Sequence, residues 1–445
     1  MSRTSELEKY LRSQQNEGHK DSEGAFSIAR EQAIRKLAGF QLPFDGAWAL
    51  KIVQAAVASG VCQEIKVTLT RTEQSFELIG VRNWTLNQLE AALFNPDSDP
   101  SRAVNHLVTG LRGVGFSDLR GFWIGLPGES EALTWNGDEL GRLPMARRME
   151  HPLLIVTCKA RFEDGGFFGL SSYATARERN ATLGKVLSTM AYTCPVPLHL
   201  DRRRIDALEL DQIHGWSKTS QLLALGFEDG DLPSLKIPRQ TGKIELWDHP
   251  VDTTMKEVTR EFRERPPART ECAVAFLVSA HLERVQQGKT AVWKEREDCS
   301  HCNWVADGVV VQTQTLGPEA SFCSAGWFLS ADGLETDLTT LSLRDTPERN
   351  RRFQLSRQLV GEGLQNLTAM DPSKISELER KSTVKGAVVF LVLGAGLTFL
   401  SPVHGVACMG MGAFGLYAST NAGKQRERLL RDGLGVLQGK FDGRI

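Results

Sequence analysis

The chain has 445 residues, of which 41% are hydrophobic and 24% charged, and these proportions are typical of a folded protein of about two or three units. Its 53 basic and 54 acidic residues give a net charge of -1. No basic surplus exists to coat nucleic-acid phosphates, so we expect no nucleic-acid partner. Eight scattered cysteines indicate reduced thiols in a cytosolic setting rather than a disulfide scaffold. Residues 1–25 lack the apolar core of a secretory signal and are predicted to be a mobile polar tail.

Hydrophobic periodicity divides residues 26–211 into the elements of a first α+β domain. Residues 44–59 carry apolar side chains at helical spacing, and Gly60 is a typical helix stop. Residues 64–70 and 75–81 alternate between polar and apolar side chains, which predicts a β-hairpin. Further helices are expected at 29–38, 86–94 and 175–193, and further strands at 122–126, 153–160 and 195–205.

A glycine-rich run, Gly110-Leu-Arg-Gly113-Val-Gly115-Phe116, is predicted to be a loop. Backbone N–H groups in such a loop can bind an anion. An ordinary tight loop is an equally open interpretation, because glycine runs are common turn signals.

Residues 212–372 are predicted to form a second α+β domain. Residues 222–242 are expected to be a loop, and residues 252–263 a helix. Four strand-like runs follow, separated by short polar or glycine-containing loops, and they predict an antiparallel β-meander. These runs are 272–280, 291–295, 304–314 and 322–330. A charged amphipathic helix is expected at 344–367.

The most distinctive segment lies near the carboxyl end, after a linker at 373–384. Residues 386–423 contain no Asp, Glu, Lys or Arg, and His404 is their one imidazole. A membrane span needs roughly 20 apolar residues. The segment is too long for one upright span, and residues 401–405 suit a turn. Basic residues on both flanks favour the cytoplasmic side for both ends, including a basic tail at 424–445. We therefore predict a transmembrane helical hairpin at 385–423.

Ten large apolar side chains of this hairpin are expected to contact membrane lipid, which would make the protein membrane-associated with its bulk on the cytoplasmic side. They are Val388, Phe390, Leu391, Leu397, Phe399, Leu400, Val406, Met409, Phe414 and Leu416. The alternative is a hairpin buried in the core of a soluble helical domain or in an oligomer.

Cys299, Cys302 and Cys323 are the candidate ligands of a metal site. A structural zinc site needs four ligands, usually in two close pairs, and only one close pair exists here. We therefore expect packed thiols and regard a metal cofactor as unfavoured.

The order of helix, hairpin, helix, glycine-rich loop and strands resembles the ATP-binding domain of the GHKL superfamily, the Bergerat fold of type II topoisomerases, heat-shock chaperones, sensor histidine kinases and mismatch-repair ATPases. Residues 52–60 and 65–69 look like the first motif helix and its following strand. Residues 110–116 look like the lid loop, and residues 195–201 look like the strand that opens a transducer-like domain. The resemblance implies an α/β sandwich with ATP as a possible ligand. The nucleotide-binding residues that it implies are Lys51, Gln54, Gly110, Gly113, Gly115 and Phe116.

The departures from this family concern catalysis. Its first motif supplies an acid that activates water and, four residues later, an Asn that holds Mg²⁺. These positions fall on Lys51 and Ala55, or on Leu50 and Gln54 if the register shifts by one. The second-motif Asp is missing from residues 79–83. Hydrolysis needs a base and a metal, so the resemblance implies a degenerate domain without turnover.

The sequence thus predicts a GHKL-like α/β sandwich, a transducer-like α+β domain with a β-meander, and a C-terminal apolar hairpin. The expected function is a membrane-tethered sensor or scaffold with a protein partner or self-association, and a defence or stress effector role is one form of it. One alternative is an active ATPase with displaced catalytic groups such as Glu31 or Asp45. Another is a soluble oligomeric interaction protein.

Overall fold

The structure is a computed structural model, and it describes residues 42–94, 100–115, 120–136, 139–158, 170–206, 220–228, 274–287, 290–295, 299–317, 322–337, 341–368, 428–429 and 431–443. Several predicted segments lie outside these residues and stay predictions: the tail at 1–25, the helices at 29–38 and 252–263, the linker at 373–384 and the hairpin at 385–423. Within the described ranges, none of the helices combines the length and the apolar character that a membrane crossing requires.

Eight strands form the first sheet, in the order β5-β4-β3-β6-β2-β1-β7-β8. β1 pairs with β7 in parallel, and every other neighbouring pair in this sheet is antiparallel. The predicted hairpin is present as β1 and β2. The bounds are Glu64–Leu69 (β1), Glu73–Ile79 (β2), Arg120–Gly125 (β3), Glu131–Trp135 (β4), Leu140–Pro144 (β5), Leu153–Cys158 (β6), Leu198–Leu200 (β7) and Arg203–Arg204 (β8).

Two parts of this sheet differ from the sequence prediction. Strands β4 and β5 were not expected, because β5 lies at the sheet edge with most of its side chains exposed and gives little alternation to detect. The single strand expected at 195–205 is two strands, β7 and β8. They are separated by Asp201 and Arg202, which both have positive φ and therefore turn the chain.

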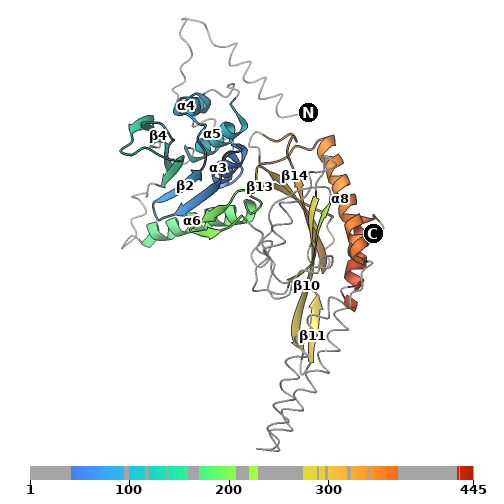
Figure 1. Cartoon of the computed structure of the whole chain (residues 1–445). Coiled ribbons are helices and arrows are strands. Elements are labelled where there is room, and N and C mark those ends of the chain that lie inside the picture. Colours follow the sequence, from blue (N-terminus) through green and yellow to red (C-terminus); the bar gives the residue numbers. More distant parts are fainter. Residues whose placement is uncertain are drawn as a thin grey trace, which may run out of the picture.

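Helix α3 (Ala47–Ala58) is the centre of the first core. It packs against α5 (Arg102–Gly115) and α6 (Leu170–Met190), while α4 (Leu86–Phe94) packs on α5 (Figure 1). The first ten residues of α3 are all buried, and the ring of Trp48 meets that of Phe76 on β2 at 5.4 Å. An alanine-rich helix suits this position because small side chains let two helices approach it closely.

The prediction of a loop at 110–115 is wrong, because Gly110, Gly113 and Gly115 belong to α5. The reason is helix packing. A Cβ on Gly110 would lie 2.8 Å from Ile52 Cδ1 and 3.1 Å from the Trp48 carbonyl oxygen, and a Cβ on Gly113 would collide with Leu42. These two glycines therefore allow α5 to lie directly on α3.

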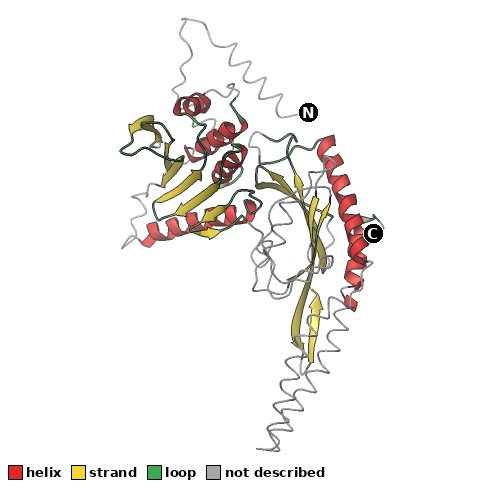
Figure 2. Cartoon of the chain, viewed as in Figure 1, coloured by secondary structure: helices red, strands yellow, loops and turns green. Residues whose placement is uncertain are grey.

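The second sheet has the order β11-β10-β14-β12-β13, with β9 also paired to β10. It is not the expected meander, because β12 and β14 are parallel neighbours. The strand expected at 304–314 is a hairpin of β12 and β13. The loop expected at 222–242 is wrong for residues 222–228, which belong to strand β9. The bounds are Ser220–Glu228 (β9), Val274–Gln287 (β10), Thr290–Glu295 (β11), His301–Ala306 (β12), Val309–Thr315 (β13) and Cys323–Ser330 (β14). The α+β class expected from the sequence is confirmed (Figure 2).

Two helices cover the second sheet. Helix α8 (Pro347–Thr368) confirms the expected amphipathic helix, and the end of the predicted basic tail is helical at 431–441. Trp327 on β14 donates its indole N–H to Ser356 of α8 and packs edge-on against Phe441 at 5.5 Å. Arg352 of α8 donates to the Asp332 carbonyl oxygen just after β14, whereas Gly433 lies against Cys323 at the start of β14. The two helices therefore run in opposite directions along β14.

Candidate functional site

Two buried polar residues of α3 face the second sheet. Lys51 and Gln54 are both 0% exposed, although α3 is otherwise apolar. Lys51 Nζ donates to Gln54 Oε1 at 2.8 Å, and Gln54 Nε2 donates to the carbonyl oxygen of Ala306 at 3.1 Å. A hydrogen-bonded chain therefore leads from the core of the first sheet to the end of β12.

Asp307 and Gly308 form the two-residue turn between β12 and β13, here called the junction turn. Both have positive φ, 47° and 76°, and Asp-Gly is among the sequences that favour such hairpin turns. The first sheet with helices α3–α6 is here called the first body, and the second sheet with α8 and residues 431–441 the second body. The junction turn lies against the first body, where Thr193 donates to the Gly308 carbonyl oxygen at 3.1 Å. A Cβ on Gly308 would be 2.8 Å from Pro195 Cδ and 3.2 Å from Val57 Cγ2, so glycine is required by space as well as by φ.

The carboxylate of Asp307 binds two side chains of α5. Oδ2 accepts a hydrogen bond from Arg102 Nε at 2.8 Å and lies 2.9 Å from His106 Nε2. Arg102 is the first residue of α5, and His106 lies one turn later on the same helix face. These contacts join residues about 200 positions apart in sequence, and they connect the two sheets.

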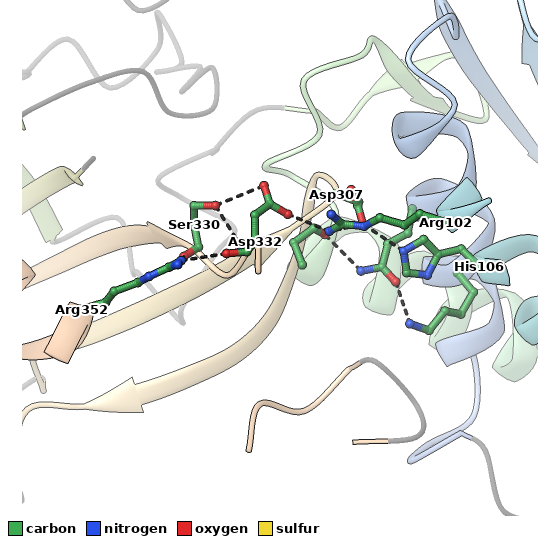
Figure 3. Close-up of polar contacts among 9 residues, drawn as sticks. Arg102, His106, Asp307, Ser330, Asp332 and Arg352 are labelled. Atoms are coloured by element: carbon green, nitrogen blue, oxygen red, sulfur yellow. Dashed lines mark hydrogen bonds and ion pairs between the residues drawn. The ribbon is translucent and has the colours of Figure 1, made fainter. Parts of the chain in front are cut away.

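The polar network continues toward α8 (Figure 3). Arg102 also binds Asp332 Oδ1 at 2.7 Å, and Ser330 donates to Asp332 Oδ2 at 3.2 Å. Arg352 donates to the backbone carbonyl of Asp332 at 2.8 Å and to Glu348 on its own helix. The network thus reaches from α5 to the first turns of α8.

Burial sets the protonation of this network. It lowers the pKa of Lys51 to about 7, although the charges of Asp337 and Asp307 oppose the shift. It also lowers the pKa of His106, against the effect of the Asp307 hydrogen bond, so that a neutral imidazole donates to Asp307 near pH 7. Burial alone would raise the pKa of Asp307. The hydrogen bond from His106 and the charge of Arg102 outweigh it, and the pKa of Asp307 is lowered.

Comparison with known proteins finds likenesses to solved structures. Neither a protein-family model nor a curated protein matches this sequence. A solved structure, the B subunit of the DNA gyrase from Myxococcus xanthus, is similar over 71% of this chain and 88% of that chain, with 12% identity and a TM-score of 0.37.

The structure brings only part of the predicted nucleotide site together. Lys51 and Gln54 share one buried hydrogen bond, and Gly110 and Gly113 lie across from them on α5, where they serve helix packing. Phe116, like the alternative catalytic residue Glu31, lies outside the described residues. In the described conformation the polar atoms of Lys51 and Gln54 face protein rather than solvent.

Among the described residues, no three His, Cys, Asp or Glu side chains are grouped to hold an ion. Cys302 and Cys323 are buried within β12 and β14, and Cys299 is half-buried before β12. Burial of Cys302 and Cys323 in the sheet agrees with packed thiols.

Sequence analysis missed Arg102, His106 and Asp307. The one local signal was the Asp307-Gly308 dipeptide inside a β-rich run, which favours a two-residue hairpin. Nothing in the sequence near this dipeptide indicates which helix its carboxylate contacts.

Proposed function

We propose that the chain is a membrane-tethered sensor or scaffold whose GHKL-like front domain no longer hydrolyses ATP. Residues 385–423 form the membrane hairpin, the body of the chain lies on the cytoplasmic side, and a protein partner or a second copy receives the signal. A role at the membrane in a defence or stress system fits this arrangement.

The observation that carries the proposal is the environment of Lys51. The resemblance places the water-activating acid of the family at this residue and the Mg²⁺-holding Asn at Ala55. A general base must reach the proton that it abstracts, directly or through one water. Lys51 is instead fully buried, and its amine is bonded to Gln54. An alanine side chain supplies no metal ligand. Both groups that turnover needs are therefore missing at these positions.

A sensor also needs a physical connection between its ligand-binding part and its output. The junction turn supports such a connection, because Gln54, Arg102 and His106 of the first body all bond to residues 306–307 of the second. A change at α3 or α5 thus acts directly on the β12–β13 hairpin. Arg102 and Asp332 extend the same contacts toward α8.

The packing of the flanking helices supports a hairpin rather than a single crossing. Because α8 and residues 431–441 run in opposite directions along β14, the end of α8 and the start of the second helix lie toward the same end of that strand. A segment joined to both of these ends leaves and returns on one side of the second body, as both basic flanks also favour.

Phosphate release from Mg-ATP by the detergent-purified full chain tests the loss of hydrolysis. We expect the wild type, Lys51→Met and Gln54→Leu to release phosphate at the same background rate. Lys66→Met is the matched control, because Lys66 lies on the exposed side of β1. Turnover that Lys51→Met or Gln54→Leu abolishes and Lys66→Met retains would refute the proposal.

Extraction of isolated membranes tests the tether. The full chain should stay in the pellet in alkaline carbonate and be released only by detergent. The double variant Leu397→Arg and Phe414→Arg should appear in the soluble fraction, because a charge at the centre of a span is costly. Release of the wild type by carbonate alone would rule out membrane insertion.

A further inference from the structure

Two basic side chains of the first body contact one carboxylate of the second, and a third interacts with its charge. Arg102 and His106 contact Asp307 directly, and Lys51 lies close enough for its charge to interact with that of Asp307. His106 is only 7% exposed and Lys51 is fully buried, whereas the Arg102 side chain is 52% exposed, so the site combines two buried groups with a guanidinium at the surface. The Asp307 carboxylate belongs to the junction turn, whereas the three basic side chains belong to helices α3 and α5.

This set of donors has the chemistry of an oxyanion site. Arg102 offers a planar fork of N–H groups, and His106 offers one ring N–H at fixed geometry. Arg102 also begins the 14-residue helix α5, whose N-terminal end carries a partial positive charge. Lys51 adds an amine that can take up a proton when an anion arrives. A phosphate group offers the same kind of oxygen acceptors as the carboxylate, with more charge.

We propose that Arg102, His106 and Lys51 form a binding site for a phosphate-bearing ligand, and that Asp307 occupies this site as an intramolecular competitor. Arrival of the ligand displaces the junction turn and releases the β12–β13 hairpin from α5. This proposal rests on the proposed sensor function and names the chemical class of its ligand.

In this proposal the Asp307 carboxylate and phosphate compete for the same donors, and this competition sets the apparent affinity for phosphate. A tethered carboxylate acts at an effective concentration on the order of millimolar or higher, so it reduces the apparent affinity of an external anion. Removing the negative charge of Asp307 should therefore increase phosphate affinity. A residue that only stabilises the interface would give no such gain.

Asp307→Asn is the decisive variant. Asn-Gly forms the same type of hairpin turn as Asp-Gly and tolerates positive φ, so the variant keeps the backbone and the side-chain shape while it removes the charge. Asp332→Asn is the matched control. It removes a carboxylate that also binds Arg102 but is 60% exposed, away from His106.

Binding of inorganic phosphate to the full chain in detergent is measured by calorimetry at constant ionic strength and pH. We expect Asp307→Asn to bind at least about tenfold more tightly than the wild type, the range in which removal of an intramolecular competitor acts. Asp332→Asn should stay within about threefold of the wild type, and Asp307→Asn with Arg102→Gln should lose the gain. Equal affinity of folded Asp307→Asn and wild type would overturn the proposal.

A measurement on the wild type covers the case in which Asp307→Asn does not fold. Hydrogen exchange of residues 301–315 is compared in phosphate and in chloride of equal ionic strength. Faster exchange around the junction turn in phosphate supports displacement, and unchanged exchange at saturating phosphate refutes it. ATP turnover and carbonate extraction are unaffected by either result, so failure of this inference is distinguishable from failure of the proposed function.

Discussion

Asp307 accepts a hydrogen bond from His106 across 201 positions of sequence, with 2.9 Å between Oδ2 and Nε2. One carboxylate in a turn of the second sheet is thereby bound to a helix of the first, and Arg102 binds the same oxygen. The two halves of the chain meet at this turn.

A comparison of Gly308→Ala with Gly317→Ala should separate the cost of steric contact from the cost of backbone strain. An alanine at positive φ costs about 1–2 kcal/mol at any position. At Gly308 the new Cβ also meets Pro195 and the Cys194 backbone, whereas at Gly317, with φ of 73°, nothing lies within 4 Å. Gly308→Ala should therefore lower the free energy of unfolding by roughly 1–3 kcal/mol more than Gly317→Ala. Denaturant titration of both variants measures the difference, and equal losses would show that the turn is not tightly packed.

Two glycine-to-alanine substitutions in helices should have opposite signs. Gly184→Ala in α6 meets only Leu200 at 3.6 Å and should gain about 0.5–1 kcal/mol from helix propensity. Gly110→Ala in α5 places a Cβ against Ile52 and the Trp48 carbonyl, and it should lose about 1–3 kcal/mol through overpacking. Thermal unfolding of both variants tests this. A stabilised Gly110→Ala would mean that α5 does not need a glycine at its contact with α3.

Lys51→Met should change how stability depends on pH. Folded Lys51 has a pKa of about 7 and the unfolded residue one near 10.5, so between these values the unfolded chain holds the extra proton. The stability of the wild type relative to Lys51→Met should therefore rise with pH from 7 to 10.5, by at most about 1.4 kcal/mol per unit. Below pH 7 the difference should be constant. Parallel curves for the two proteins from pH 7 to 9.5 would contradict the burial of an amine at this position.

Phe441→Ala should weaken the contact between the C-terminal helix and α8. Phe441 is buried against Trp327 and Gly361, whereas Val436 on the same helix is 41% exposed. Truncation of a buried Phe costs about 3–5 kcal/mol, and that of an exposed side chain less than about 0.5 kcal/mol. Amide exchange of α8 should therefore rise in Phe441→Ala and stay unchanged in Val436→Ala. Equal exchange in both variants would indicate that the C-terminal helix is not packed on α8.

Local pattern was enough to predict much of the fold. The apolar spacing of residues 44–59 predicted α3, and alternation predicted β1, β2 and most of the second sheet. Local pattern gave the wrong prediction at Gly110 and Gly113. A glycine that serves helix packing differs from a turn glycine only in the residue that it contacts in space. For these two glycines that residue is Trp48, about 60 positions away in sequence. Local pattern failed to order the second sheet for the same reason, since the parallel contact of β12 and β14 is not encoded in either strand alone.

The candidate site was predicted even less completely. Lys51 and Gln54 were identified through a family resemblance, and their burial depends on the β12–β13 hairpin about 250 positions later. Asp307-Gly308 was visible as a turn sequence, but its partners on α5 follow only from the tertiary structure. Residues that join two sheets leave no periodic signal, because each one is a single polar position in an element shaped by other contacts.

Hydrogen exchange at residues 301–315 and at the first turn of α5 tests most directly whether Asp307 joins the two bodies. We expect Asp307→Asn to raise exchange at both places, and Asp332→Asn, which loses exposed contacts to Arg102 and Ser330, to leave both close to the wild type. Unchanged protection in folded Asp307→Asn would contradict a junction held by this carboxylate.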